Sequence, residues 1–175
     1  MLEVGVPPGL HPNEVALTHT EARSHFGAWA ITSSPLILGL DVRDPTVMDA
    51  NWDIISNKEA LAVNEAWAGS SGLRIASSPS NHTFPFCGYL YANGCSIPTW
   101  EIFSKPLSKG GAALLFLNHG DSSTNITINT ADVPYLQCSQ CQVRDVWLHQ
   151  DMGVQGPLIQ VNNLASHDSV FLTLQ

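Results

Sequence analysis

The chain has 175 residues, of which 44% are hydrophobic and 13% charged, a composition typical of a globular protein rather than a disordered one. Fifteen acidic residues against seven lysines and arginines give a formal net charge of -8 without a basic stripe. We therefore expect neither nucleic acid nor an anionic membrane as a partner. No apolar run approaches the ~18 residues of a membrane span, and the first residues do not resemble a signal peptide.

A helix is predicted after the proline- and glycine-rich start of the chain. Thr18 and Glu21 have the spacing of a capping box, in which the hydroxyl and the carboxylate each accept a hydrogen bond from a free backbone amide. Phe26 and Trp29 then recur at helical spacing. Pro35 predicts the end of the helix, because proline disfavours helical backbone in the residue before it.

The next segment, residues 36–40, is a continuous apolar run, which is typical of a short strand covered on both faces. A polar turn with Asp41 and Arg43 follows, and a second helical pattern runs from residue 47 to 63. A helix that leads into a doubly buried strand is half of a β/α unit. With one clear unit of this kind, the chain is expected to be the end of a barrel whose earlier part it does not contain.

The pattern changes after residues 68–72, where helical periodicity stops. Short β-rich runs separated by turns replace it, which predicts an antiparallel β-sandwich. We therefore predict two domains, with residues 1–72 as an incomplete barrel end and residues 73–175 as the sandwich. The predicted strands cover residues 100–103, 112–117, 125–128, 142–147, 158–161 and 170–174.

Asp41 is a candidate catalytic group, because the carboxyl ends of barrel strands face the active site. The alternative, which we favour, is that Asp41 caps the next helix or pairs with Arg43. Asp41 and Asp44 lie three residues apart around one turn, whereas the two carboxylates of a glycosidase usually stand on different strands. This pair therefore does not predict a catalytic site.

Histidines and tryptophans suggest packing rather than chemistry. The seven histidines show no zinc-binding spacing, so we predict no metal site. Without a P-loop, a GxGxxG or a GxSxG motif, neither a nucleotide cofactor nor a serine nucleophile is predicted. His25 is expected to be a hydrogen-bonded packing residue, and most of the five tryptophans are expected in the core rather than on a sugar-stacking surface.

The four cysteines form two close pairs, Cys87 with Cys95 and Cys138 with Cys141. Pairs in polar loops favour disulfides and an oxidising compartment over the free thiols of a cytosolic protein. Of the three possible connectivities we favour Cys87–Cys95 as one bridge. The other pair is expected to close locally or to bond to the first. Two Asn-x-Thr sequons, which are candidate glycosylation sites, begin at Asn81 and Asn125.

Two ordered sets of motifs resemble those of a known family. The first set covers residues 1–5, 20–31, 34–39, 41–43, 55–59 and 62–64, and the second, looser set covers residues 105–107, 112–118, 143–147 and 165–169. Both resemble glycoside hydrolase family 27, which contains the α-galactosidases (melibiases) and the α-N-acetylgalactosaminidases.

The resemblance implies the last β/α elements of a TIM (β/α)8 barrel followed by a C-terminal antiparallel β-sandwich. It also implies retaining hydrolysis of terminal α-galactosides by two aspartates, one acting as nucleophile and the other as acid and then base. Both lie on strands before the motif that opens this chain, so we expect no catalytic residue here and no activity from this chain alone. The position matching Asp41 is not one of the pair. Met1 matches a pocket-lining position and is the one predicted substrate contact.

For the whole protein the resemblance implies an oligosaccharide or glycoconjugate with terminal α-galactose as substrate and no cofactor. It further implies secretion or a lysosomal or vacuolar location, and a possible homo-oligomer. The alternative, from another class, is a non-catalytic carbohydrate-binding or structural module built on the sandwich.

Overall fold

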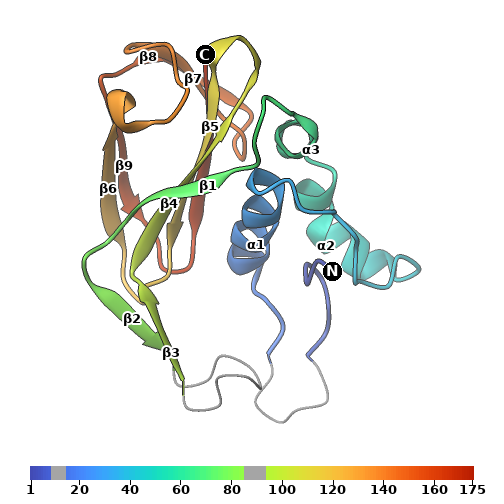
Figure 1. The fold of residues 1–175 in the computed structure, drawn as a ribbon. Helices are drawn as coiled ribbons and strands as arrows, with labels where there is room; N and C mark the ends of the chain where they lie inside the picture. The colour runs from blue at the N-terminus through green and yellow to red at the C-terminus, as the bar shows by residue number, and fades with distance from the viewer. Residues whose placement is uncertain (9–14, 85–93) are drawn as a thin grey trace.

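The computed structural model describes residues 1–8, 15–84 and 94–175. Within this part the chain forms three layers (Figure 1). Helices lie against one face of a six-stranded antiparallel sheet, and a two-stranded sheet covers the other face. The antiparallel β-sandwich predicted for the second half of the chain is confirmed.

Each helix begins at a side chain that accepts hydrogen bonds from its free amides. At the predicted capping box, Thr18 Oγ1 accepts from the backbone N–H of Glu21, and the Thr18 N–H donates to the Glu21 carboxylate at 2.8 Å. Asp44 and Asn57 cap the other two helices in the same way. The helices are α1 (His19–Ile31), α2 (Pro45–Ile55) and α3 (Lys58–Glu65).

The strands order as β1-β4-β5-β10-β7-β8 in the large sheet, as β6-β9 in the sheet that covers it, and as a separate β2-β3 hairpin. All six predicted β-rich runs form strands, except that residues 146 and 147 lie in the turn after β7, and four further strands are present in the described residues. Their bounds are β1 (Leu73–Ser77), β2 (Asn81–Phe84), β3 (Cys95–Pro98), β4 (Trp100–Pro106), β5 (Ala112–Asn118), β6 (Thr124–Asn129), β7 (Cys141–Asp145), β8 (Gln150–Gln155), β9 (Leu158–Leu164) and β10 (Ser169–Leu174).

Strand β5 is buried along its whole length because both faces of the large sheet are covered there. Successive side chains of a strand point to opposite faces. Leu115 and Leu117 therefore join the core under the helices, and Leu114 and Phe116 join the core under β6 and β9. The continuous apolar sequence of β5 follows from this double burial.

The core under the helices contains residues from both halves of the chain. Phe26 and Ala30 of α1 pack in one cluster with Leu115 of β5 and Phe171 of β10, and all four are at most 1% exposed. The helical layer and the large sheet therefore bury each other.

The prediction of a doubly buried strand at residues 36–40 is wrong. The segment forms a single parallel bridge, between Leu38 and Leu2, and the Leu2 N–H donates to the Ile37 carbonyl at 2.8 Å. Ile37 is 60% exposed and Leu38 37% exposed, whereas Leu40 is buried. The physical reason is that, among the described residues, only the segment around Leu2 pairs with it, so no second strand covers the remaining edge.

Gly72 joins the helical layer to β1 at a close backbone approach. A Cβ atom at this position would lie 2.3 Å from the Ile31 carbonyl oxygen, which also accepts a hydrogen bond from the Gly72 N–H at 2.9 Å. We expect Gly72→Ala to lower the free energy of unfolding by about 1–3 kcal/mol, because backbone has to move. Chemical denaturation checks this. Gly120→Ala is the control, since Gly120 has no positive φ and a Cβ there would lie 3.3 Å or more from its nearest atom, a side-chain oxygen; an equal loss in both variants would contradict the contact argument.

Candidate functional site

A cavity of about 480 Å³ opens beyond the carboxyl ends of the two parallel segments. Gly5 and Val6 line it from the first segment, Asp41 follows the second, and Val47 and Asn51 line it from α2. In a β/α barrel this end of the strands carries the chemistry. Catalytic groups of a barrel enzyme are therefore expected to line this cavity.

The two carboxylates at this cavity already have partners. Asp41 accepts hydrogen bonds from the Arg43 guanidinium at 2.9 Å through each oxygen and from the Arg43 N–H at 3.0 Å. These bonds hold the pKa of Asp41 below its ordinary value, which is the wrong direction for a general acid. Asp44 accepts from the Thr46 N–H at 2.9 Å as the cap of α2. The predicted Asp41–Arg43 pair is confirmed, and the cap of the next helix is Asp44 rather than Asp41.

Met1 lies next to the parallel bridge and is 71% exposed. Its role as a substrate contact stays a prediction. His25 behaves as the sequence predicts, since its Nε2 accepts a hydrogen bond from the Glu3 N–H at 3.2 Å and its ring lies beside Trp29. Burial lowers the pKa of His25, which favours the neutral ring that this hydrogen bond needs. The described residues contain no group of three or more metal-ligating side chains placed to hold an ion.

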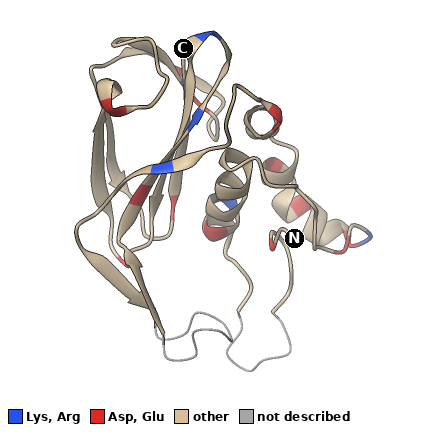
Figure 2. Ribbon diagram, in the orientation of Figure 1, with Lys and Arg blue, Asp and Glu red and all other residues tan. Residues whose placement is uncertain are grey.

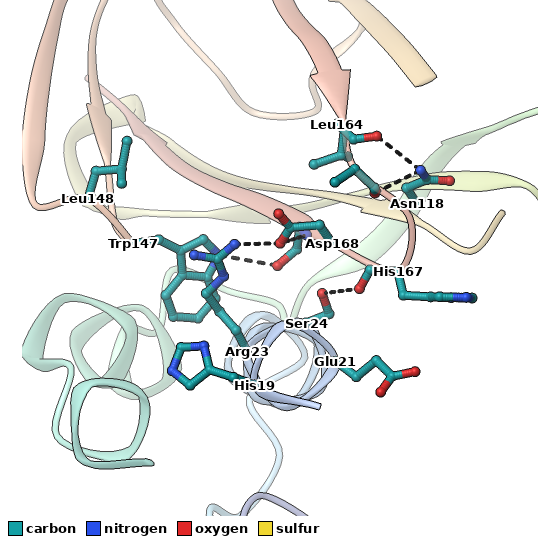
Figure 3. Close-up of polar contacts among 12 residues, drawn as sticks. His19, Glu21, Arg23, Ser24, Asn118, Trp147, Leu148, Leu164, His167 and Asp168 are labelled. Carbon is teal, nitrogen blue, oxygen red and sulfur yellow. Dashed lines mark hydrogen bonds and ion pairs between the residues drawn. The ribbon is translucent and has the colours of Figure 1, made fainter. Parts of the chain in front are cut away.

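Several hydrogen bonds and ion pairs join the helices to the sandwich. Figure 3 shows Arg23 of α1 reaching Asp168, at 2.5 Å between Nη2 and Oδ1. The two side chains are only 25% and 20% exposed. Beside them, the Ser24 hydroxyl donates to the His167 carbonyl at 2.9 Å. Two adjacent residues of α1 are thus bonded to two adjacent residues of the loop before β10.

Helix α3 is held by a buried lysine of the sheet. Lys105 is fully buried, and its ammonium donates to the Val63 carbonyl and, at 3.0 Å, to the Asn64 carbonyl. Both carbonyls lie in the last turn of α3, where backbone acceptors have no helical partner and a positive charge is favourable. Burial lowers the pKa of Lys105.

Two further contacts fix the first turn of α3 to β7 and the turn after it. The side-chain amide of Asn57, which is 3% exposed, donates to the Val146 carbonyl at 3.0 Å. Glu59 makes a bidentate pair with Arg144, with two bonds of 2.7 Å, and its carboxylate also contacts His149. The hydrogen bonds from Arg144 hold the pKa of Glu59 below its ordinary value.

Sequence reasoning missed the residues of this contact, Arg23, Asn57, Lys105 and Asp168. The signal that could have found them is that each lies in one of the motifs that carry the family resemblance. All four arginines of the chain form ion pairs with carboxylates, and Figure 2 shows the basic residues spread over different elements rather than gathered on one face.

The ion pairs of Glu101 in β4 can be tested by measuring the free energy of unfolding as a function of pH. Hydrogen bonds from His119 and Arg74 hold the pKa of Glu101 below its ordinary value of 4.5, and the side chain is 13% exposed. A carboxylate with a lowered folded-state pKa stabilises the fold above the unfolded-state pKa and loses that contribution as pH falls through the folded-state pKa. We expect the free energy of unfolding to fall below about pH 4.5.

Urea denaturation between pH 7 and pH 3 measures this fall. The variant Glu101→Gln should be less stable at pH 7 and should show a shallower loss. Glu65→Gln, at an exposed position of α3, should keep the slope of the unsubstituted chain. An unchanged slope for Glu101→Gln would contradict the assignment.

The local disulfide between Cys138 and Cys141 is confirmed, with 5.3 Å between their Cα atoms. Cys95 is also disulfide-bonded. The predicted Cys87–Cys95 bridge falls outside the described residues, because Cys87 is not among them. The sequon asparagines Asn81 and Asn125 are exposed on β2 and β6, and their glycosylation stays a prediction.

Three of the five tryptophans pack against a core, as predicted for most of them, and the other two are exposed. Trp52 is 57% exposed on the outer face of α2, and Trp67 is 69% exposed in the turn after α3. Trp29, Trp100 and Trp147 pack against the two cores, as predicted. The helical spacing of Trp52 indicated a helix correctly, but that helix packs through Ile54, which is 1% exposed.

Comparisons with known proteins agree with this architecture. Residues 98–174 match the family described as the α-galactosidase C-terminal β-sandwich domain. The chain is 30% identical to an α-galactosidase of Coffea arabica over 99% of its own length and 38% of that protein. It is 31% identical to α-galactosidase 2 of Arabidopsis thaliana over 85% of its length and 30% of that protein.

Solved structures share the fold. α-Galactosidase I from Mortierella vinacea matches 95% of this chain and 38% of its own, with a TM-score of 0.71 and 26% identity. The Saccharomyces cerevisiae α-galactosidase solved with raffinose matches 99% of this chain and 45% of its own, with a TM-score of 0.72 and 19% identity.

The fold and these matches define a class, the C-terminal β-sandwich region of α-galactosidase-type glycosidases. Within that class the chain belongs to the C-terminal region of glycoside hydrolase family 27, as the sequence motifs indicated. It spans about a third of the length of the curated relatives that it matches, 38% and 30% of the two plant enzymes.

Proposed function

We propose that the chain is the C-terminal region of a retaining α-galactosidase-type enzyme that releases terminal α-linked galactose. In this proposal residues 1–72 are the last β/α elements of its TIM barrel and residues 73–175 form the sandwich domain. The observation that carries the proposal is the parallel bridge between Leu2 and Leu38, with α1 in the connection between them. Two parallel segments joined through a helix are the repeating unit of a β/α barrel.

The catalytic carboxylates are proposed to come from barrel strands that precede this chain's motifs. Retaining hydrolysis needs two carboxyl groups about 5–5.5 Å apart and free to react. The carboxylates at the cavity, Asp41 and Asp44, are held by Arg43 and by the start of α2. In this proposal the two carboxylates stabilise the wall of the cavity and take no part in the chemistry. Met1 is the proposed substrate contact in this chain.

The sandwich is proposed to hold the barrel end in position. Lys105 bonds the end of α3, Asn57 and Glu59 bond its beginning, and Arg23 bonds α1. Because these contacts are buried or half-buried, they define one relative placement of helices and sheet.

The proposed setting is a secreted or vacuolar protein acting on α-galactosides. The Cys138–Cys141 disulfide supports an oxidising compartment. Among the described residues no helix is long and apolar enough to cross a membrane. The names of the relatives, and the raffinose bound in one related structure, support the substrate class.

An activity assay on two proteins tests the proposal. The 175-residue chain alone is expected to show no turnover of an aryl α-galactoside above background. A chimera in which the chain replaces the matching 38% of the Coffea arabica enzyme should hydrolyse it. Turnover by the chain alone would contradict the proposed origin of the carboxylates. A chimera that is folded by circular dichroism and inactive would contradict the proposed family function.

A further inference from the structure

A second concave site lies on the sandwich, and its lining residues are distant in sequence from the two parallel segments. It is a groove of about 230 Å³ between the edge formed by β1 and β4 and the segment that follows β6. Leu73, Ser104 and Pro106 line it from the sheet, and Pro134 and Tyr135 line it from the opposite segment. It shares no lining residue with the cavity at the ends of the parallel segments.

One residue of the groove has an unsatisfied polar group. Ser104 is 5% exposed, and its hydroxyl has no hydrogen-bond partner among the described residues. A buried hydroxyl without a partner destabilises a fold, and most buried polar atoms in proteins do have one. A ligand hydroxyl that reaches Ser104 would remove this cost.

Tyr135, at the opposite wall, has an unfavourable backbone. Its φ angle is +65°, a region that bulky side chains rarely adopt, and the side chain is 74% exposed. The ring is therefore displayed to solvent at the groove by a strained residue. Strain of this kind is found more often at ligand-binding positions than elsewhere.

The lining indicates the chemistry of the ligand. The hydroxyls of Ser70 and Ser104 can donate hydrogen bonds to a ligand and accept them from it. The prolines and the Tyr135 ring present apolar faces. Arg74 also lines the groove, but its guanidinium is paired with Glu101 at 2.5 Å, so no anion is called for. A small neutral ligand with several hydroxyls and one apolar face meets these requirements.

We infer that this groove binds one unit of a neutral hexopyranose sugar, with a C–H face on the Tyr135 ring and a hydroxyl on Ser104. The site goes beyond the proposed hydrolysis, because it needs neither the barrel nor a carboxylate. A ligand of this size is expected to bind on the order of millimolar.

The test is a titration of the isotope-labelled 175-residue chain with D-galactose, followed by amide NMR shifts at residues 104 and 135. We expect saturable shifts. Ser104→Ala and Tyr135→Asn should each weaken binding by about tenfold or more while leaving the melting temperature unchanged or raised, because they remove the orphan hydroxyl and the strained bulky residue. Trp52→Ala, which removes another exposed aromatic ring, is the matched control and should bind normally.

Three outcomes would overturn the inference. They are the absence of saturable shifts up to ~100 mM galactose, equal saturation by glycerol, and unchanged affinity in both groove variants. Catalysis plays no part in this experiment, so its failure leaves the proposed hydrolysis standing. Equally, an inactive chimera would leave a saturable, variant-sensitive groove in place.

Discussion

Replacing Lys105 with methionine is expected to lower the free energy of unfolding by about 3 kcal/mol. Methionine keeps most of the apolar volume of the buried side chain but removes the ammonium. The carbonyls of Val63 and Asn64 in the last turn of α3 would then lose the donor that the structure gives them. A buried carbonyl without a donor destabilises the fold, because no hydrogen bond then offsets the cost of removing it from water. Helix α3 should loosen from the sheet before the rest of the fold.

Urea denaturation and hydrogen exchange at α3 measure this change. Lys58→Met, at an exposed position of the same helix, is the control and should stay within about 0.5 kcal/mol of the unsubstituted chain. A Lys105→Met chain of unchanged stability would show that the buried charge costs as much as its bonds contribute.

The same lysine predicts a pH effect of known sign. Because burial lowers the pKa of Lys105, the unfolded chain binds more protons than the folded chain as pH rises towards the ordinary lysine value of 10.5. The contribution of this group to stability therefore rises in that alkaline range. Lys105→Met should lack that rise, so the stability difference between the two chains should widen as pH is raised.

The motifs in the two halves of the chain turn out to meet each other in space. Glu59 from the motif at 55–59 pairs with Arg144 from the motif at 143–147. Lys105 bonds the carbonyl of Asn64, 41 residues earlier. Arg23 pairs with Asp168 across 145 residues. The motifs could be read from the sequence, but these pairings could not, because each depends on a tertiary contact between distant segments.

Two apolar runs in this chain look alike in sequence and differ in the fold. Residues 112–117 become the central strand β5, because β4 and β10 pair with its two edges and both faces are covered. Residues 36–40 have the same continuous apolar character but only a bridge to Leu2. Periodicity reports what a segment is able to bury, and neighbours decide whether it is buried.

Strand β8 shows the opposite limit. Met152 and Val154 alternate with polar residues or glycine in its sequence, but both are exposed, as are almost all of its residues, at the edge of the sheet. Pairing with β7 alone makes it a strand. The candidate groove could not be predicted from the sequence for a related reason. Ser104 and Tyr135 line one groove only when the sheet and the segment after β6 are folded.

The sandwich without the helical layer is expected to aggregate. Residues 73–175 alone would expose Phe103, Leu115, Leu117 and Phe171, which in the whole chain pack in one core with α1. An uncovered apolar face of this kind promotes association. Light scattering should therefore find residues 73–175 associated at concentrations where the whole chain is soluble, with a fluorescent hydrophobic dye bound.

The alternation of β5 supplies a matched pair of rescue variants for this experiment. Leu115→Thr with Leu117→Thr makes the face abandoned by the helices more polar and should reduce the association. Leu114→Thr with Phe116→Thr changes the face that β6 and β9 still cover, so it should unfold the sheet instead. A soluble, cooperatively unfolding monomer of residues 73–175 without any substitution would contradict the dependence of the sheet on the helices. Equal effects of the two double variants would contradict the assignment of the faces, which follows from the alternation of side chains along a single strand.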